Sequence, residues 1–354
     1  MKTILTLLVC WFTCLTIQGQ IHDITVQSSP TDQLLIGLHI LDEQTVWASG
    51  TGATVVFTSD GGQSWNKAIW DNDPKLQFRD IHGFSATQAV VLSSGTGADS
   101  RIYTLDTSQN TWLEVYRMPH ETGFLDALAF WDASQGIAYG DAVSGKPFIL
   151  ITADGGQNWL EVPGASLPDA GPGEGGFASS GTNIALPELG VAIIGTGAGG
   201  NARLLITQDF GKTWSAKETP MVKGEAAGIT SVRMLDAQRG IIAGGDLGQM
   251  NSYLDQLYLT QDQGETWTKI NPSRTPGPIY GSALTRIGQS EVLITTGPKG
   301  AQVTEDWGRT WQPISDQNLW STDLHPSGVG YLVGQKGMIL KWTYLPQKLS
   351  AAFY

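Results

Sequence analysis

One glycine-rich segment carries a lone carboxylate and could form a binding loop. The run Gly171-Pro-Gly-Glu-Gly-Gly176 surrounds Glu174 with residues that allow unusual backbone conformations. Such loops often place functional side chains on a rigid scaffold, whereas a linker that needs positive φ angles is an equally simple interpretation. It is not a phosphate-binding loop, because no Gly-Lys-Ser/Thr sequence follows it. Glu174 is therefore a candidate binding residue, and both interpretations stay open.

The other reactive residue types form no familiar catalytic or metal-binding pattern. The sequence has no Gly-x-Ser-x-Gly motif and no Rossmann glycine fingerprint, so nothing indicates a serine hydrolase or a nucleotide-dependent redox enzyme. We expect no cofactor. The histidines show none of the spacings typical of metal ligands, so we expect no metal either. They are His22, His39, His82, His120 and His325.

The first nineteen residues predict a secretory signal peptide. Lys2 provides a positive start, residues 4–17 are apolar, and Gly19 is a small residue at the expected cleavage site. The apolar run is short for a membrane anchor, so we expect an exported protein, periplasmic or extracellular, without an integral membrane segment. Cys10 and Cys14 both lie in this segment, so the mature protein would contain no cysteine.

Composition and charge exclude several classes of function. Of the 354 residues, 41% are hydrophobic and only 15% are charged, so the chain can bury a core and is not disordered. It has 33 acidic and 21 basic side chains, which give a net charge of -12. Because binding of phosphates needs a basic surface, we expect no nucleic-acid ligand.

A repeated phrase is the strongest signal in the sequence. Thr-x-Asp-x-Gly-x-x-Trp occurs five times, and a sixth copy from Thr104 to Trp112 has one extra residue and lacks the glycine. The tryptophans recur at intervals of 44 to 55 residues, which is the length of a four-stranded β-propeller blade. The five complete copies start at Thr58, Thr152, Thr207, Thr260 and Thr304.

This phrase, the Asp box, has a structural explanation that involves no chemistry. The aspartate can accept hydrogen bonds from backbone N–H groups of its own turn, the glycine supplies a positive φ, and the tryptophan buries a large ring between blades. We expect a hairpin between the third and fourth strands of each blade. The structural residues are Asp60 and Trp65, Asp154 and Trp159, Asp209 and Trp214, Asp262 and Trp267, and Asp306 and Trp311.

The pattern of strands predicts an all-β fold, a seven-bladed β-propeller of four-stranded blades. A seventh unit, from Trp320 to Trp342, has only three strands and no Asp box. Residues 23–27 alternate polar and apolar side chains like a half-buried strand. We expect this N-terminal strand to complete the last blade and close the ring. The alternative is six blades with an extra hairpin. The expected organisation is one domain over residues 20–346 and a tail over 347–354.

Function in such a ring is expected at the rim of the central channel, which the innermost strands line. The alternative is an ordinary solvated channel wall with internal salt bridges. We expect the innermost strand of the fourth blade, which follows the glycine-rich segment, at residues 178–182. The polar candidates on the innermost strands are Arg79, Asp80, His82, Asp126, Thr182, Tyr280 and Asp323.

The mature chain resembles the photosystem II stability/assembly factor family and its bacterial BNR-repeat relatives over essentially its whole length. Besides the Asp boxes, the matching motifs are Phe78-Arg-Asp-Ile81, Phe130-Trp-Asp-Ala133, Pro172-Gly-Glu-Gly175 and Ala243-Gly-Gly-Asp246. The resemblance implies a propeller that holds a protein client and catalyses nothing. Arg79 is the one arginine that we place near the channel, where these factors have an arginine-rich patch.

The Asp boxes also resemble those of sialidases, which implies a different function. Sialidases hydrolyse glycosides with an arginine triad and a Tyr–Glu nucleophile pair, whose groups must lie within a few ångströms of each other. The residues that the resemblance offers for the triad are Arg79, Arg233 and Arg286, and those for the pair are Tyr280 and Glu174. The sialidase signature Phe/Tyr-Arg-Ile-Pro before the first Asp box is absent.

The leading hypothesis is an exported, monomeric, non-enzymatic scaffold that binds a protein or a glycan at the channel rim. An acidic partner is disfavoured, because the field of the protein would repel it. The alternatives are a sialidase-like glycoside hydrolase that uses Glu174 and Tyr280 and an exported oxidoreductase, a name loosely attached to relatives. The candidate binding residues are Arg79, Asp80, His82, Asp126, Glu174 and Tyr280.

Overall fold

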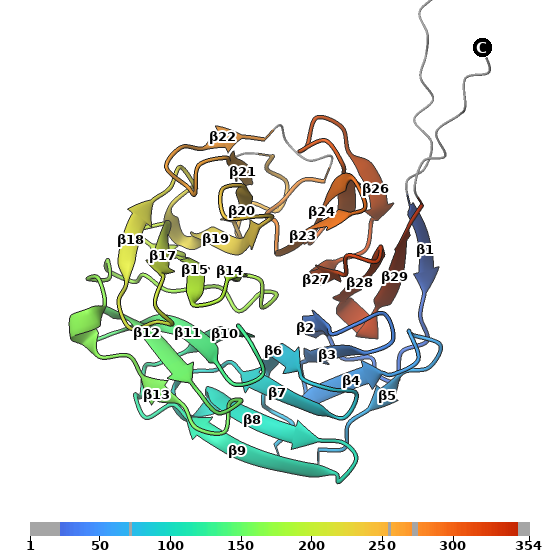
Figure 1. The fold of residues 1–354 in the computed structure, drawn as a ribbon, viewed down its shortest axis with the longest axis horizontal. Coiled ribbons are helices and arrows are strands. Elements are labelled where there is room, and N and C mark those ends of the chain that lie inside the picture. Colours follow the sequence, from blue (N-terminus) through green and yellow to red (C-terminus); the bar gives the residue numbers. More distant parts are fainter. Residues whose placement is uncertain (1–21, 71–72, 254–255, 271–274, 346–354) are drawn as a thin grey trace, which may run out of the picture.

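Short strands rich in β-branched and aromatic residues form most of the regular structure in the described part of the chain. The computed structural model describes residues 22–70, 73–253, 256–270 and 275–345. Within these residues the strands build seven antiparallel sheets, arranged as blades around a central channel (Figure 1). This confirms the all-β, seven-bladed propeller, and the six-bladed alternative is wrong.

In each blade the chain begins at the channel and meanders outward. The first three blades are β2–β5 (Leu35–Ile40, Val46–Gly50, Thr54–Thr58, Asn66–Lys67), β6–β9 (Phe78–Gly83, Gln88–Ser93, Arg101–Asp106, Thr111–Arg117) and β10–β13 (Leu125–Phe130, Gly136–Val143, Lys146–Thr152, Leu160–Glu161). Blade 4 consists of β14 (Ile184–Glu188), β15 (Val191–Gly195), β17 (Arg203–Thr207) and β18 (Ser215–Glu218).

The remaining blades follow the same plan. Blade 5 contains β19–β22 (Gly224–Met234, Gly240–Asp246, Leu257–Thr260, Thr268–Lys269), and blade 6 contains β23–β26 (Gly281–Ile287, Ser290–Gly297, Gly300–Thr304, Gln312–Ser315). Blade 7 contains β27 (Leu319–Leu324), β28 (Val329–Gly334) and β29 (Ile339–Tyr344). Short 3-10 turns lie at Gly97–Asp99, Gly164–Ser166 and Gln335–Gly337.

The last blade is completed by the N-terminal strand. β1 (His22–Val26) pairs antiparallel with β29, from His22 opposite Tyr344 to Val26 opposite Leu340. The prediction that residues 23–27 close the ring is therefore confirmed, with a shift of one residue. The predicted signal peptide over 1–19 and the tail over 347–354 lie outside the described residues.

Large side chains between neighbouring blades hold the ring together. Trp47, Tyr331 and Trp342 are fully buried. The Asp-box residue Trp65 of blade 1 meets Tyr331 of blade 7 edge-on, with ring centroids 5.7 Å apart. Because each buried aromatic ring removes a large apolar area from water, these side chains stabilise the packing of blades 1 and 7 against each other and against their other neighbours.

The Asp-box turns share one hydrogen-bond pattern. In the first box, Ser64 donates to the Asp60 carboxylate through its N–H (2.9 Å) and its hydroxyl (2.6 Å), and Thr58 Oγ1 donates over 2.7 Å. These bonds, led by the Ser64 hydroxyl, lower the pKa of Asp60 to about 2. Gly62 takes the positive φ, +84°. The matching Thr hydroxyl and backbone N–H bonds recur at Asp154, Asp209, Asp262 and Asp306.

Blades 4 and 5 differ from the prediction. The innermost strand of blade 4 is β14, whereas residues 178–182 form a loop inside the channel, because their side chains and carbonyls bond to other blades instead of to β15. Blade 5 has five strands rather than four, since β16 (Gly197–Gly199) adds to β19. A Cβ on Gly228 would lie 2.4 Å from the Cα of Gly197, so this pairing depends on glycine.

Candidate functional site

A loop of residues 176–183, called the channel loop below, projects from the start of β14 into the centre of the ring (Figure 1). Its Gly181 has φ +70°, and a Cβ there would lie 2.1 Å from Oδ1 of Asp80. The loop therefore packs directly on the channel wall. Its hydrogen-bond partners on blades 2, 3, 5, 6 and 7 include Arg79, Asp141, Ser231, Tyr280 and Ser321.

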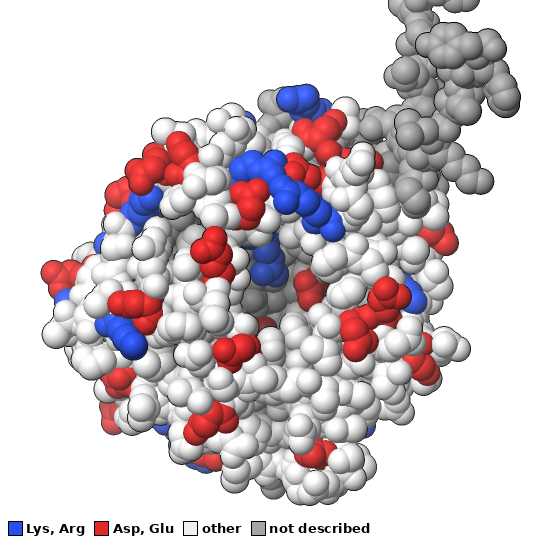
Figure 2. All heavy atoms as spheres, in the orientation of Figure 1, with Lys and Arg blue, Asp and Glu red and all other residues white. Residues whose placement is uncertain are grey.

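The channel loop separates two cavities. The first, called the aromatic pocket, measures about 370 Å³ and lies where the chain enters the innermost strands; loop residues 176–179 line it. The second, called the charged cavity, measures about 300 Å³ and lies where these strands end, on the face of the Asp-box turns; Gly181 lines it. Figure 2 shows a hollow at the centre of the ring, with basic and acidic atoms in its wall.

Aromatic rings and one arginine form a wall of the aromatic pocket. The rings of Tyr280 and Trp320 lie 4.9 Å apart, and the Arg79 guanidinium lies 5.8 Å from the Trp320 ring, a cation–π contact. Arg79 Nη1 also donates to the carbonyl of Ala178 over 3.1 Å. Burial raises the pKa of Tyr280, so its phenol keeps its proton at neutral pH. The pocket offers flat aromatic surface beside one positive group.

Two aspartates also line the aromatic pocket. Asp126 is buried, and burial together with neighbouring Asp141 raises its pKa well above the ordinary value. Burial raises the pKa of Asp141 as well, although its Oδ1 accepts the N–H of Gly176 over 3.0 Å. Oδ2 of Asp126 has no hydrogen-bond partner among the described residues. These carboxyls hold protons more tightly than exposed aspartates do.

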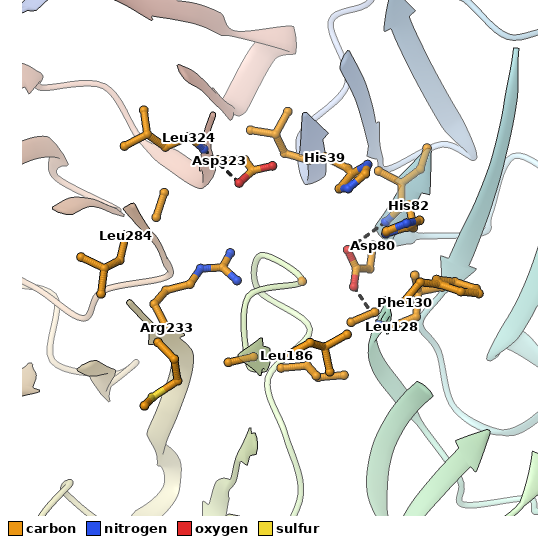
Figure 3. A pocket seen from close by; sticks show the side chains of 18 of the residues that line it. His39, Asp80, His82, Leu128, Phe130, Leu186, Arg233, Leu284, Asp323 and Leu324 are labelled. Carbon is orange, nitrogen blue, oxygen red and sulfur yellow. Dashed lines mark hydrogen bonds between the residues drawn. The ribbon is translucent and has the colours of Figure 1, made fainter. Parts of the chain in front are cut away.

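Ionisable side chains from four blades line the charged cavity (Figure 3). Arg233 of β19 points into the space between Asp323 of β27 and Asp80 of β6. His39 and His82 stack with ring centroids 4.1 Å apart. Burial lowers the pKa of both histidines, so both rings are neutral at neutral pH.

The two aspartates of the charged cavity also tie blades together. Asp80 accepts the N–H of Ile81 and, from blade 3, that of Leu128, each over 2.8 Å. Asp323 accepts the N–H of Leu324 over 2.9 Å and, from blade 1, that of Ile40 over 2.8 Å. Burial raises the pKa of Asp80 to about 8, despite these backbone hydrogen bonds. Asp80 is therefore mostly protonated at neutral pH.

The six candidate binding residues fall into three places. Arg79, Asp126 and Tyr280 line the aromatic pocket, whereas Asp80 and His82 line the charged cavity. The sixth, Glu174, lines neither of the two cavities.

Glu174 anchors the base of the channel loop. It is buried, and its carboxylate accepts hydrogen bonds from Arg203 Nε (2.7 Å), Asn201 Nδ2 (3.0 Å) and the N–H of Gly171 (2.7 Å). Burial alone would raise the pKa of Glu174, but these bonds, strongest from Arg203, bring it below the ordinary value. The structure therefore gives Glu174 a local structural role.

The groups that sialidase chemistry would use are not brought together. Arg79 and Arg233 line different cavities, on opposite sides of the channel loop. Arg286 forms ion pairs with Asp236 (3.3 Å) and Glu291 (3.1 Å). Among the described residues, no group of three or more His, Cys, Asp or Glu side chains could hold a metal ion.

His39, Trp320 and Asp141 line the two cavities, but no motif in the sequence indicated them as site residues. A signal for the charged cavity exists in the repeat itself. In each blade the innermost strand pairs with the second strand up to the hairpin turn. The residue just before the last of these pairs is His39, His82, Arg233 and Asp323 in blades 1, 2, 5 and 7. Aligning the innermost strands of the blades by this register would have grouped them.

The fold is a seven-bladed β-propeller, and its central channel has a ligand-sized cavity on each side of the channel loop. No known family model matches the chain. It is similar to a solved structure described as YCF48 bound to D1 peptide, with a TM-score of 0.65 and 18% identity over 92% of this chain and 98% of that one. It is also similar to YCF48 from Cyanidioschyzon merolae, with a TM-score of 0.63 and 17% identity over 90% and 98%.

These likenesses show that the chain shares the propeller fold of YCF48, the fold that the sequence resemblance implied. Within the described residues, no helix has the length and apolar character needed to span a bilayer.

Proposed function

We propose that this protein is a non-enzymatic β-propeller that binds a protein partner through the aromatic pocket. The observation that carries this proposal is the wall formed by Arg79, Tyr280 and Trp320 around a space of about 370 Å³. Trp, Tyr and Arg are the residue types on which protein interfaces depend most. The similar propeller YCF48, which has been solved with a D1 peptide, supports the same class of ligand.

The aromatic pocket suits one large side chain of a partner, with further contact around it. Met250, which is 38% exposed, adds apolar surface to the lining. The pairing of an aromatic wall with a nearby guanidinium supports both apolar and polar contacts to a peptide. The net charge of -12 favours a neutral or basic partner over an acidic one.

Export and a monomeric state belong to the same proposal. The signal peptide predicted over residues 1–19 supports transfer to the periplasm or the exterior. N-terminal sequencing of the protein isolated from its host tests this, and a chain that starts near residue 20 is expected. A cytoplasmic protein that retains Lys2 would contradict export.

Peptide selection tests partner binding even though the natural partner is unidentified. Peptides selected from a random library on the purified protein are measured by calorimetry against the wild type and Trp320→Ala. We expect the substitution to weaken binding by about tenfold or more, because it removes the central ring of the pocket. Leu160→Ala, at an exposed position on the outer strand β13, is the control and should bind as the wild type does.

Two results would contradict the proposal. The first is selected peptides that bind Trp320→Ala as tightly as the wild type. The second is hydrolysis of a fluorogenic glycoside panel, sialosides included, that Glu174→Gln or Tyr280→Phe abolishes. A glycan array run in parallel shows whether a glycan, the second ligand class expected from the sequence, occupies the same pocket, since Trp320→Ala would then reduce glycan binding.

A further inference from the structure

The charged cavity has no part in the proposed function, and its chemistry differs from that of the aromatic pocket. It lies on the other side of the channel loop and has a volume of about 300 Å³. Most of its ionisable and apolar side chains come from the innermost strands and not from surface loops. A space of this size, with polar groups held on rigid elements, is typical of a small-molecule site.

Arg233 presents an unused pair of donor groups to this cavity. Its Nε donates to the carbonyl of Ser282 over 2.7 Å, which fixes the plane of the guanidinium. Its two terminal nitrogens face the cavity, and they form no ion pair or hydrogen bond with any described residue. A guanidinium that is fixed in this way, with both terminal nitrogens free of protein partners, matches the two oxygens of a carboxylate.

Asp323 supplies the opposite charge across the same space. Its two oxygens accept one backbone N–H each, from Leu324 and Ile40. A carboxylate has about four acceptor sites, so each oxygen can accept a further hydrogen bond from the cavity. Burial lowers the pKa of the Arg233 guanidinium, and the charge of Asp323 opposes this shift, although no ion pair or hydrogen bond joins the two side chains.

The other titratable groups of the wall are neutral at neutral pH. Burial raises the pKa of Asp80 to about 8 and lowers the pKa of His39 and of His82. One positive group and one negative group therefore remain, on opposite sides of a gap. A ligand with a single charge would pair with only one of them, whereas a zwitterion would pair with both.

The rest of the lining is apolar. Phe130, Leu186 and Leu284, labelled in Figure 3, line the cavity between the charged groups, and Met234 lines it as well. An apolar side chain of a ligand would be buried against them, and the removal of its surface from water favours binding. A sugar would instead set hydroxyl groups against this surface, where they would lack hydrogen-bond partners.

We propose that the charged cavity binds a free α-amino acid with an apolar side chain. The carboxylate of the ligand accepts two hydrogen bonds from the terminal nitrogens of Arg233, and its ammonium group donates to Asp323. The side chain packs on Leu186, Met234 and Leu284. This site would make the propeller a two-ligand protein, with a metabolite on one face and a protein partner on the other.

Calorimetry with the purified protein and leucine tests the proposal, and analogues separate the two charges. We expect leucine to bind, and 4-methylpentanoate and isopentylamine, which each lack one charged group, to bind about ten- to hundredfold more weakly. Arg233→Gln and Asp323→Asn should each weaken leucine binding by a similar factor. The control is Arg286→Gln, because Arg286 already pairs with Asp236 and Glu291 outside the cavity, and it should leave binding unchanged.

Several outcomes would overturn the proposal. They are the absence of binding by leucine, phenylalanine and methionine alike, equal binding of leucine and 4-methylpentanoate, and unchanged leucine binding by Arg233→Gln. A monosaccharide that binds in competition with leucine would replace the ligand class. The analogue series needs no variant, so the proposal remains testable if Asp323→Asn disturbs the contact between blades 7 and 1. None of these results depends on binding at the aromatic pocket.

Discussion

The aromatic pocket and the charged cavity are built on the same innermost strands, yet they present different chemistry. Arg79 and Trp320, near the starts of β6 and β27, serve the aromatic pocket, whereas His82 and Asp323, near the ends of the same two strands, serve the charged cavity. The difference between the two sites therefore comes from position along a strand and not from the choice of blade.

The channel loop lies between the two cavities and makes them separate sites. Phe177 and Ala178 face the aromatic pocket, and Gly181 faces the charged cavity. Without the loop, the starts and the ends of the strands would line one continuous channel. Variants that disturb the loop, or one cavity at a time, therefore test whether the two sites are independent.

The largest effect is expected from Glu174→Ala at the base of the loop. The Arg203 side chain is 11% exposed and that of Glu174 only 1%, so the substitution leaves a buried guanidinium without its carboxylate. Removing one partner of a buried ion pair typically costs about 3–5 kcal/mol. Urea unfolding measures the loss, and Glu188→Ala, an exposed glutamate at the end of β14, is the control. A loss no greater than that of the control would show that the channel loop does not depend on this anchor.

The second prediction concerns Asp80, a buried carboxyl that is specific to the charged cavity. Burial raises its folded-state pKa to about 8, whereas an unfolded aspartate titrates near about 3.9. Its contribution to stability is therefore fully present below that unfolded value and is lost as the pH rises through about 8. Asp80→Asn cannot ionise, so the wild type should lose more stability than this variant between about pH 5 and pH 8.

At about 1.4 kcal/mol for each pKa unit, the difference between the two pH profiles reaches a few kcal/mol. Denaturant unfolding at several pH values measures it. Asp316→Asn, at an exposed position, should follow the wild-type profile. Parallel profiles for the wild type and Asp80→Asn would mean that Asp80 is ionised in the folded state, and the charged cavity would then carry a second negative group.

The sequence predicted the ring well because each blade carries its own local signals. The Asp boxes and the strands before them lie within single repeats. The seventh unit lacks a strand, and the alternating residues 23–27 predict the strand that completes it. The path of the channel loop depends instead on distant partners. Ser180 contacts Ser321, 141 positions away, and Thr182 contacts Ser231, 49 positions away. Residues 178–182 were predicted as a strand because no local signal reports such contacts.

The sequence also does not predict that the candidate binding residues are divided between two cavities. Arg79 and Asp80 are neighbours, and both were expected at a single channel rim. A register shift in β6 between Phe78 and Asp80 interrupts the regular alternation of the strand, and the channel loop then separates their side chains. Adjacent residues consequently serve different cavities, which only the three-dimensional path of the loop determines.

The smallest effect is expected from Gly181→Ala, and it distinguishes the two cavities most sharply. The backbone conformation with φ +70° costs alanine about 1–3 kcal/mol, and the new methyl group would also meet the Asp80 carboxyl at 2.1 Å unless that side chain shifts. Gly145→Ala isolates the backbone part, because Gly145 has φ +78° and a Cβ added there would meet nothing within 4 Å. Thermal unfolding of both variants should show a larger loss for Gly181→Ala.

The binding assays then decide which side of the loop has moved. Because Gly181 lines the charged cavity and not the aromatic pocket, Gly181→Ala should weaken leucine binding more than binding of the selected peptides. An equal loss at both sites would show that the channel loop moves as one rigid piece and couples the two cavities. A loss confined to the peptides would contradict the assignment of Gly181 to the wall of the charged cavity.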